Sequence, residues 1–165
     1  MNSADFLRKI SIAVKEFYEN DSVLTTLNTE RPIVHRIALY LEPLFKESNI
    51  DCDYNRYGSR TKALEQIHER NPNRSTDMIY PDIVIHRRLS EERDNAAVIE
   101  VKSTADIDDC DRMKLELMTR VDEAAQYKYQ FGLFLGFETS GCKWILFVNG
   151  ERSAEGTIRA TSSGS

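Results

Sequence analysis

Apolar side chains recur every three or four positions in two stretches near the start of the chain. The first stretch, residues 4–19, carries its stripe at Phe6, Ile10, Ala13, Val14 and Phe17. The second carries its stripe at Ile33, Ile37, Leu41 and Leu44. This spacing gathers apolar side chains on one helical face, so it predicts a helix over 4–19 and another that begins near Thr29. Pro32 suits the first turn of that second helix, where no intrahelical hydrogen bond needs its missing N–H.

Shorter apolar runs dominate the rest of the chain and predict strands. The clearest are DIVIH (82–86), NAAVIEVKS (95–103), FGLFLGFE (131–138) and CKWILFVNG (142–150). A more polar run over 50–58 ends in a glycine and predicts a further strand. Helical patterns return at 60–70, before a loop over 69–77, and at 107–129, where Met113, Leu117 and Val121 share a face. This order of elements predicts a mixed α/β fold with a small central sheet.

Length and composition favour one soluble domain. The 165 residues suffice for a single core, which we place within 1–150, and the polar residues 151–165 predict a flexible C-terminal tail. No apolar run is long enough for a membrane span, and the charged start of the chain resembles neither a signal peptide nor an anchor. Three separated cysteines are typical of reduced thiols in a cytoplasmic protein. The net charge of −5 argues against a protein that coats nucleic acid, but it leaves room for a local basic patch.

Charged residues interrupt two of the apolar strands, where a plain core strand has none. Asp82 opens one of these strands, and Glu100 and Lys102 close the next. Side chains two positions apart share a face of a strand, so pairing of the two strands would bring Asp82 to Glu100 with Lys102 beside both. Neighbouring carboxylates repel and are costly to desolvate. A divalent cation such as Mg²⁺, held by these carboxylates and by the carbonyl of Val101, removes that cost.

A purely structural interpretation also fits these residues. Asp82 follows the turn-forming Pro81, and Glu100 and Lys102 would form a surface salt bridge on an edge strand, where such pairs contribute little to stability. The apolar flanks point instead to buried central strands, in which isolated charges are rare. The residues alone leave both interpretations open.

Pro81-Asp82 followed by Glu100-Val101-Lys102 resembles the signature of the PD-(D/E)XK nuclease superfamily. The resemblance covers residues 30–148 and includes the apolar flanks, the intervening turn and the following amphipathic helix. DCDYNR (51–56) together with PDIVIH is also similar to a group of small bacterial proteins of this fold. The resemblance implies a restriction-endonuclease-like αβββαβ core with a mixed central sheet, to which the helix over 4–19 is an N-terminal addition.

The family implies a role for each matching residue. Asp82 and Glu100 would be metal ligands together with the Val101 carbonyl, and Lys102 would be the catalytic lysine. Mg²⁺ would be the cofactor, with Mn²⁺ as a substitute. Many members add an acid from the first core helix, and Glu30 is our candidate, although an acid that interacts only with the helix dipole is the alternative.

Other positions of the family pattern match less well. Glu42 lies at the far end of the helix that Glu30 begins, so it is a weaker candidate for the additional acid. Some nuclease branches use a Gln and a Tyr on the later helix. Gln126 and Tyr129 are the corresponding residues here, but their spacing departs from the usual pattern.

Basic side chains follow two of the predicted strands and are candidates for contacts with a phosphate backbone. They are Arg56, Arg60, Lys62, Arg87 and Arg88. The alternative is that they are ordinary solvated charges in turns. As partners we expect nucleic acid, DNA rather than RNA, and no membrane; a homodimer or a partner subunit would bring a second copy of the site or additional DNA affinity.

Two functions follow from the sequence. The first is a metal-dependent phosphodiesterase, a DNA endonuclease that cuts with metal-activated water, and fold-level analogy suggests a role in defence or restriction. The second is a nuclease-like module that binds nucleic acid or a partner protein without cutting. The complete set of two acids and a lysine favours the first, because a binding module has no need of so costly a cluster.

Overall fold

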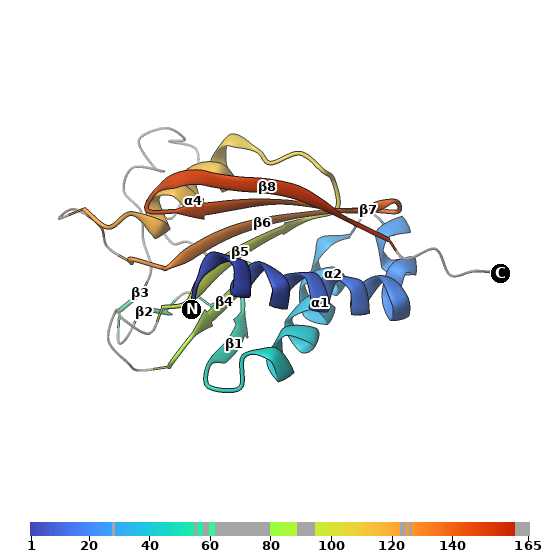
Figure 1. Cartoon of the computed structure of the whole chain (residues 1–165), viewed down its shortest axis with the longest axis horizontal. Helices are drawn as coiled ribbons and strands as arrows, with labels where there is room; N and C mark the ends of the chain where they lie inside the picture. Colours follow the sequence, from blue (N-terminus) through green and yellow to red (C-terminus); the bar gives the residue numbers. More distant parts are fainter. Residues whose placement is uncertain are drawn as a thin grey trace.

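The computed structural model describes residues 1–27, 29–54, 80–88, 95–122, 125 and 127–160, and the backbone alone of 56–57 and 60–61. These residues form an α/β fold in which helices cover both faces of a six-stranded mixed sheet (Figure 1). The helices are α1 (Ser3–Asp21), α2 (Glu30–Leu41) and α4 (Asp109–Thr119), with the 3-10 turns η1 (Ser22–Thr26) and η2 (Glu42–Leu44). The strands are β1 (Asn49–Cys52), β2 (Arg56–Tyr57), β3 (Arg60–Thr61), β4 (Ile83–His86), β5 (Ala97–Lys102), β6 (Phe131–Glu138), β7 (Gly141–Val148) and β8 (Glu151–Arg159).

The topology of the sheet brings three strand ends together. The strand order is β1-β4-β5-β6-β7-β8, and neighbours are antiparallel except β5 and β6, which are parallel. A parallel pair needs a crossover connection, and α4 lies in the segment that joins β5 to β6. Strand β4 therefore begins at the end of the sheet where β5 and β6 finish. Strands β2 and β3 form a separate hairpin.

The hydrophobic core has one part on each face of the sheet. Helices α1 and α2 cover one face, and all five side chains of the predicted α1 stripe are buried there. Phe6 of this stripe stacks on Phe131 of β6, with ring centroids 4.5 Å apart. On the other face, Leu115 and Met118 of α4 pack with Val84 and Val98. None of the described helices is long and apolar enough to cross a membrane.

The prediction of α1, α2 and the four clear strands is confirmed, whereas the helix predicted over 107–129 is wrong in its extent. Helix α4 ends at Thr119, because Arg120 takes an extended backbone conformation with ψ of 148°. The amide of Tyr129 then donates to the carbonyl of Met118 at 2.9 Å. This hydrogen bond satisfies a carbonyl at the end of the helix, and the chain turns there toward β6.

The predictions over 50–70 are partly wrong. The strand expected over 50–58 corresponds to β1, which ends at Cys52 because Asp53 adopts a positive φ of 50°. Residues 60–61 belong to β3 and not to a helix. The rest of that predicted helix and the loop over 69–77 lie outside the described residues.

The flexible tail predicted over 151–165 is wrong for residues 151–159, which form the edge strand β8. Every residue of β8 is at least partly exposed, and Ala154 and Ile158 are its apolar contacts with the core. An edge strand that buries so little surface carries only a weak alternating pattern. Residues 161–165 lie outside the described part of the chain.

Candidate active site

Asp82 and Glu100 face each other across neighbouring strands, as expected from their positions. The register pairs Ile83 of β4 with Ile99 of β5, so the residue before β4 lies opposite Glu100. Asp82 is half-buried, and its Oδ2 accepts a hydrogen bond of 2.7 Å from the amide of Val101. Glu100 is only 2% exposed. The role predicted for the Val101 carbonyl as a metal ligand stays a prediction, while its amide fixes the orientation of Asp82.

Lys102 lies on the same face of β5 as Glu100, but its ammonium contacts other acids. Its Nζ lies 3.1 Å from Oδ2 of Asp111 and 3.6 Å from Oε2 of Glu30. The acid at the start of α2 therefore joins the group through Lys102, whereas Glu42 begins η2 at the other end of that helix. The surface salt bridge between Glu100 and Lys102 that we considered as an alternative is not formed, and β5 is a central strand.

The prediction missed two residues of α4 that complete the group. Lys114 Nζ lies 2.8 Å from Oε2 of Glu100 and 2.7 Å from Oδ1 of Asp111. Asp111 and Lys114 are 3% and 7% exposed, and they share the inward face of α4 with Leu115 and Met118. We call Glu30, Asp82, Glu100, Lys102, Asp111 and Lys114 the acid–lysine cluster.

The misjudged face of α4 explains why these two residues were missed. The sequence prediction placed Met113, Leu117 and Val121 toward the core, but Met113 and Leu117 are only partly buried and Val121 is exposed. The sheet presents charged side chains to α4, so the helix turns a complementary acid and lysine toward it. A signal was present in the sequence: Asp111 and Lys114 keep helical spacing with the apolar pair Leu115 and Met118.

The position of α4 is also restricted by close contact with β6. A Cβ atom at Gly132 would lie 3.0 Å from Cγ2 of Thr119 and 3.3 Å from the carbonyl oxygen of Leu115. At Gly136, a Cβ would collide with the carbonyl of Thr104 in the segment that leads from β5 to α4. Two glycines on β6 thus let the helix and its preceding segment approach the sheet closely enough for Asp111 and Lys114 to reach β5.

Burial and neighbouring charges shift the pKa values of the cluster in opposite directions. Burial raises the pKa of Glu100 to about 8, although Lys114 favours its ionised form. Burial also raises the pKa of Asp82, against the hydrogen bond from Val101. Burial opposes the ionisation of Asp111 too, but the two lysines outweigh it and lower its pKa. Asp111 therefore carries the negative charge that keeps Lys114 protonated when Glu100 takes up a proton.

We expect Glu100 to make the stability of the protein fall with rising pH. Its pKa is about 8 in the native state and 4.5 ordinarily, so between these values the native state binds more protons than the unfolded state. The free energy of unfolding then decreases as pH rises through this window, by up to about 1.4 kcal/mol per pH unit. Urea unfolding at a series of pH values between these two should show this decrease in the free energy of unfolding for the wild type. Glu100→Gln should not show it.

A suitable control is Glu16→Gln, because Glu16 is an exposed acid on α1. This variant should keep the slope of the wild type. An unchanged slope in Glu100→Gln would show that Glu100 does not titrate between these pH values.

The donor set of the cluster fits a divalent cation. Oε1 of Glu100 is buried and has no hydrogen-bond partner in the described structure, and carboxylate oxygens are the ligands that Mg²⁺ prefers. With all groups ionised, the four acids and two lysines of the cluster leave two negative charges uncompensated. Within the described residues, however, no three His, Cys, Asp or Glu side chains stand in a metal-binding arrangement. The ammonium of Lys114 takes two of the oxygens instead.

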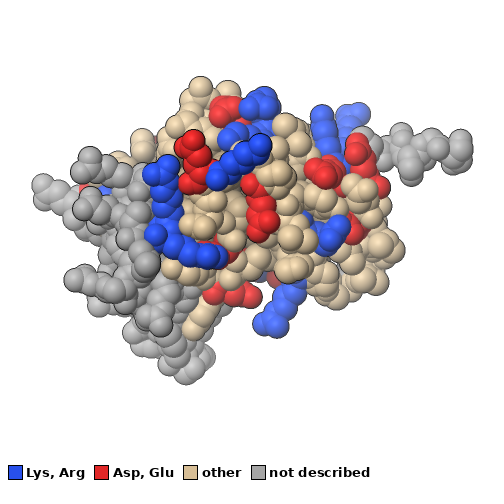
Figure 2. All heavy atoms as spheres, turned by 90° about the horizontal axis from the view of Figure 1, so that it is seen from below, with Lys and Arg blue, Asp and Glu red and all other residues tan. Residues whose placement is uncertain are grey.

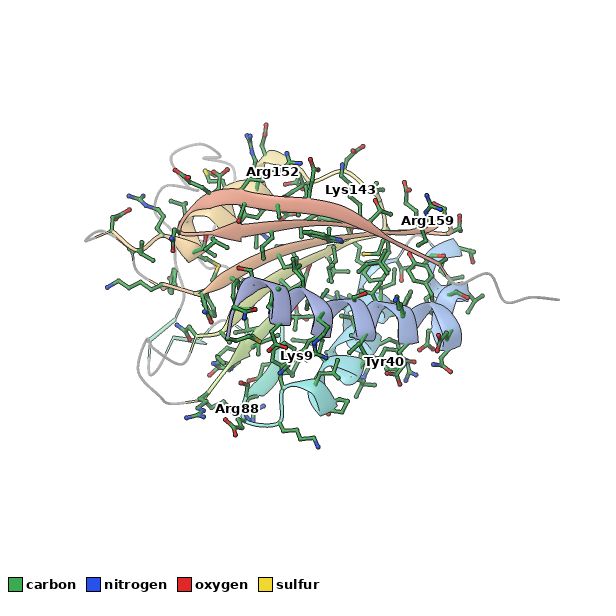
Figure 3. All side chains as sticks on the ribbon, in the orientation of Figure 1. Lys9, Tyr40, Arg88, Lys143, Arg152 and Arg159 are labelled. Carbon is green, nitrogen blue, oxygen red and sulfur yellow. The ribbon has the colours of Figure 1, made fainter. Side chains whose placement is uncertain are left out.

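The basic residues predicted to contact nucleic acid lie elsewhere or outside the described side chains. Arg87 and Arg88 follow β4, whereas Asp82 precedes it, so these arginines lie at the opposite end of that strand from the cluster. Figure 3 shows Arg88 well separated from Arg159, the last residue of β8. Arg88 pairs with Asp51, which also lies 2.8 Å from Nε2 of His86. Arg87 lies 3.7 Å from a carboxylate oxygen of Glu47.

The side chains of the other three basic candidates are outside the described part of the structure. Only the backbone of Arg56 and Arg60 is described, and Lys62 lies outside the described residues. Figure 2 shows Lys and Arg side chains interspersed with Asp and Glu on the face seen from below. A nucleic-acid contact through these residues stays a prediction.

Of the alternative Gln and Tyr pair, only Tyr129 belongs to the described residues, and it is not part of the acid–lysine cluster. Gln126 lies outside the described residues, and Tyr129 is buried with Leu115 and Met118 beyond the end of α4. The cluster itself consists of residues from α2, β5 and α4 and of Asp82, which precedes β4, and they meet at one end of the sheet. Comparisons with protein-family models, with curated proteins and with solved structures found no match to this chain.

Proposed function

We propose that this protein is a metal-dependent phosphodiesterase with a restriction-endonuclease-like core, and that it cuts DNA. The observation that carries the proposal is the pair of carboxylates, Asp82 and Glu100, that face each other across β4 and β5 with Lys102 on the same face. The core assignment is supported by the order α2-β1-β4-β5-α4-β6, in which β5 and β6 are parallel. The same order is implied by the sequence resemblance.

Asp82, Glu100 and Asp111 would hold the cation, because Asp82 lies opposite Glu100 and the Lys114 ammonium, which the cation would replace, contacts both Glu100 and Asp111. A bound Mg²⁺ supplies Lewis-acid chemistry: it polarises the scissile phosphate and lowers the pKa of its water. Glu100 has to lose its proton to act as a ligand, so we expect cation binding to strengthen as pH rises toward the pKa of about 8.

Lys102 is suited to stabilise negative charge on a phosphate. Its side chain is 24% exposed, whereas that of Lys114 is 9% exposed, so Lys102 is the ammonium that a substrate reaches first. Burial disfavours its charged form, but Asp111 and Glu30 outweigh burial and raise its pKa. Lys102 therefore stays protonated and is oriented by two acids, as required of a group that stabilises charge in a transition state.

The proposal is tested by incubating the purified protein with supercoiled plasmid in Mg²⁺ or Mn²⁺ and, in parallel, in EDTA. We expect nicked or linear plasmid with either cation and intact plasmid in EDTA. Nicking, rather than a double-strand break, is the expected product of a single site, and linear product would indicate two copies acting together. Intact plasmid in every reaction, from protein that remains folded, would contradict a DNA endonuclease.

One observation favours a module that binds without cutting. Lys114 already compensates Glu100 and Asp111, so a large part of the cluster is charge-balanced by the chain itself. Titration calorimetry with Mg²⁺ and Mn²⁺ separates the two functions. Heat of binding that is lost in Asp82→Asn supports the phosphodiesterase, and absence of binding supports the module.

A further inference from the structure

The ammonium of Lys114 occupies the position between two carboxylates of the cluster. It lies 2.8 Å from Glu100 and 2.7 Å from Asp111, and all three residues are buried. One oxygen of each carboxylate is thereby engaged. Of the two other oxygens, Oε1 of Glu100 has no hydrogen-bond partner in the described structure, and Oδ2 of Asp111 lies 3.1 Å from the Lys102 ammonium.

Lys114 and Lys102 contact different sets of acids in the cluster. Lys102 contacts Asp111 and the half-exposed Glu30 and has no ion pair with Glu100. Lys114 is the lysine of the cluster that contacts Glu100, the most deeply buried of its acids. Burying a lysine is costly unless its charge is fully paired, so this bridge holds only while both carboxylates are available to it.

A divalent cation and the Lys114 ammonium would both be bound by the carboxylates of Glu100 and Asp111. Lys114 contacts one oxygen of each carboxylate, so a cation bound by the remaining oxygens would lie beside its ammonium, and two positive charges repel strongly in a buried site. Binding of either therefore weakens binding of the other, and the coupling is reciprocal.

We propose that Lys114 is an internal competitor of the divalent cation, and that its displacement from Glu100 and Asp111 sets the cation affinity of the site. This inference rests on the proposed function, since it concerns the same cation. The bridge holds α4 against β5 without the cation, and cation binding replaces it. Release of Lys114 then frees a second ammonium beside the phosphate site.

The proposal predicts opposite effects of one substitution on stability and on cation response. Lys114→Met keeps the length of the side chain but removes the charge, so without cation the buried acids repel and the melting temperature falls. With Mn²⁺ the cation meets no competitor. We expect the rise in melting temperature on addition of Mn²⁺ to be larger than in the wild type, and the affinity measured by calorimetry to be at least about tenfold higher.

Two further variants make this test specific. Lys114→Gln keeps a hydrogen-bond donor for the two carboxylates without the charge, so it provides the same comparison if Lys114→Met does not fold. Lys9→Met removes a lysine of α1 that donates to the carbonyl of Leu44 at 2.8 Å. It should leave the response to Mn²⁺ as in the wild type.

The outcomes distinguish this inference from the proposed function. Equal, measurable Mn²⁺ affinity in the wild type and both Lys114 variants would overturn the role of Lys114 while the cation site stands. No Mn²⁺ response in any variant would overturn both the competitor and the cation site. Higher affinity in the Lys114 variants, together with plasmid cleavage by the wild type, supports both.

Discussion

Replacing Asp82 by Asn or Lys102 by Met should slow plasmid cleavage by orders of magnitude while the protein stays folded. The asparagine would keep an oxygen that accepts from the Val101 amide, now 2.7 Å from Asp82, but would lose the charge that holds a cation. The methionine would keep the apolar stem of the lysine and lose its ammonium. Removing one group that stabilises transition-state charge lowers the rate by roughly 10²–10³-fold. The measurement is the rate of nicking in Mg²⁺, beside thermal unfolding of each variant.

Matched controls lie on α1, which does not contribute to the cluster. Asp5→Asn and Lys9→Met make the same chemical changes at residues that pair with Arg8 and with the carbonyl of Leu44. Both should cleave at the rate of the wild type. If Asp82→Asn or Lys102→Met also kept that rate, the residue concerned would have no part in the reaction.

Phe6→Ala should lower the free energy of unfolding by about 3–5 kcal/mol, the usual cost of truncating a buried aromatic side chain. Phe6 is fully buried, stacks on Phe131 and lies edge-on to Phe45, so its removal leaves a cavity between α1 and the sheet. Ile12→Ala, at an exposed position of α1, is the control and should change stability by only about 0.5 kcal/mol. Urea unfolding of the three proteins measures both effects.

The result matters for the extent of the domain. Helix α1 precedes residues 30–148, the range predicted from the sequence to form the nuclease-like core, yet its stripe forms much of the core on its face of the sheet. A large loss of stability in Phe6→Ala would mean that residues 30–148 depend on α1 for their stability. Equal stability of Phe6→Ala and Ile12→Ala would contradict that and make α1 an appendage.

Local sequence patterns predicted most of the helices and strands, and they predicted the approach of Asp82 to Glu100 in the candidate site. A helical stripe such as that of α1 is a property of neighbouring residues, and all five of its side chains are buried. The approach of Asp82 to Glu100 could also be predicted, because alternation along two adjacent strands leaves few registers that keep the apolar residues buried.

Partners of the charged residues could not be predicted in the same way. Lys102 was expected beside Asp82 and Glu100, and instead contacts Glu30 and Asp111. The distances from Lys102 to these acids depend on how α2 and α4 dock on the sheet. Docking is decided by contacts between residues far apart in the sequence, such as the approach of α4 to Gly132 of β6.

The sequence by itself determined the positions of α1, α2 and four strands, and the pairing of Asp82 with Glu100, because each depends on short-range periodicity. Only the tertiary structure decided which face of α4 turns inward, and with it the places of Asp111 and Lys114 in the cluster. It also decided that residues 151–159 form β8, an edge strand whose small buried surface leaves little trace in the sequence. Both depend on contacts between residues far apart in the sequence. A buried charge is stable only where another element places an opposite charge beside it. An edge strand forms only where a neighbouring strand has free backbone groups to hydrogen-bond.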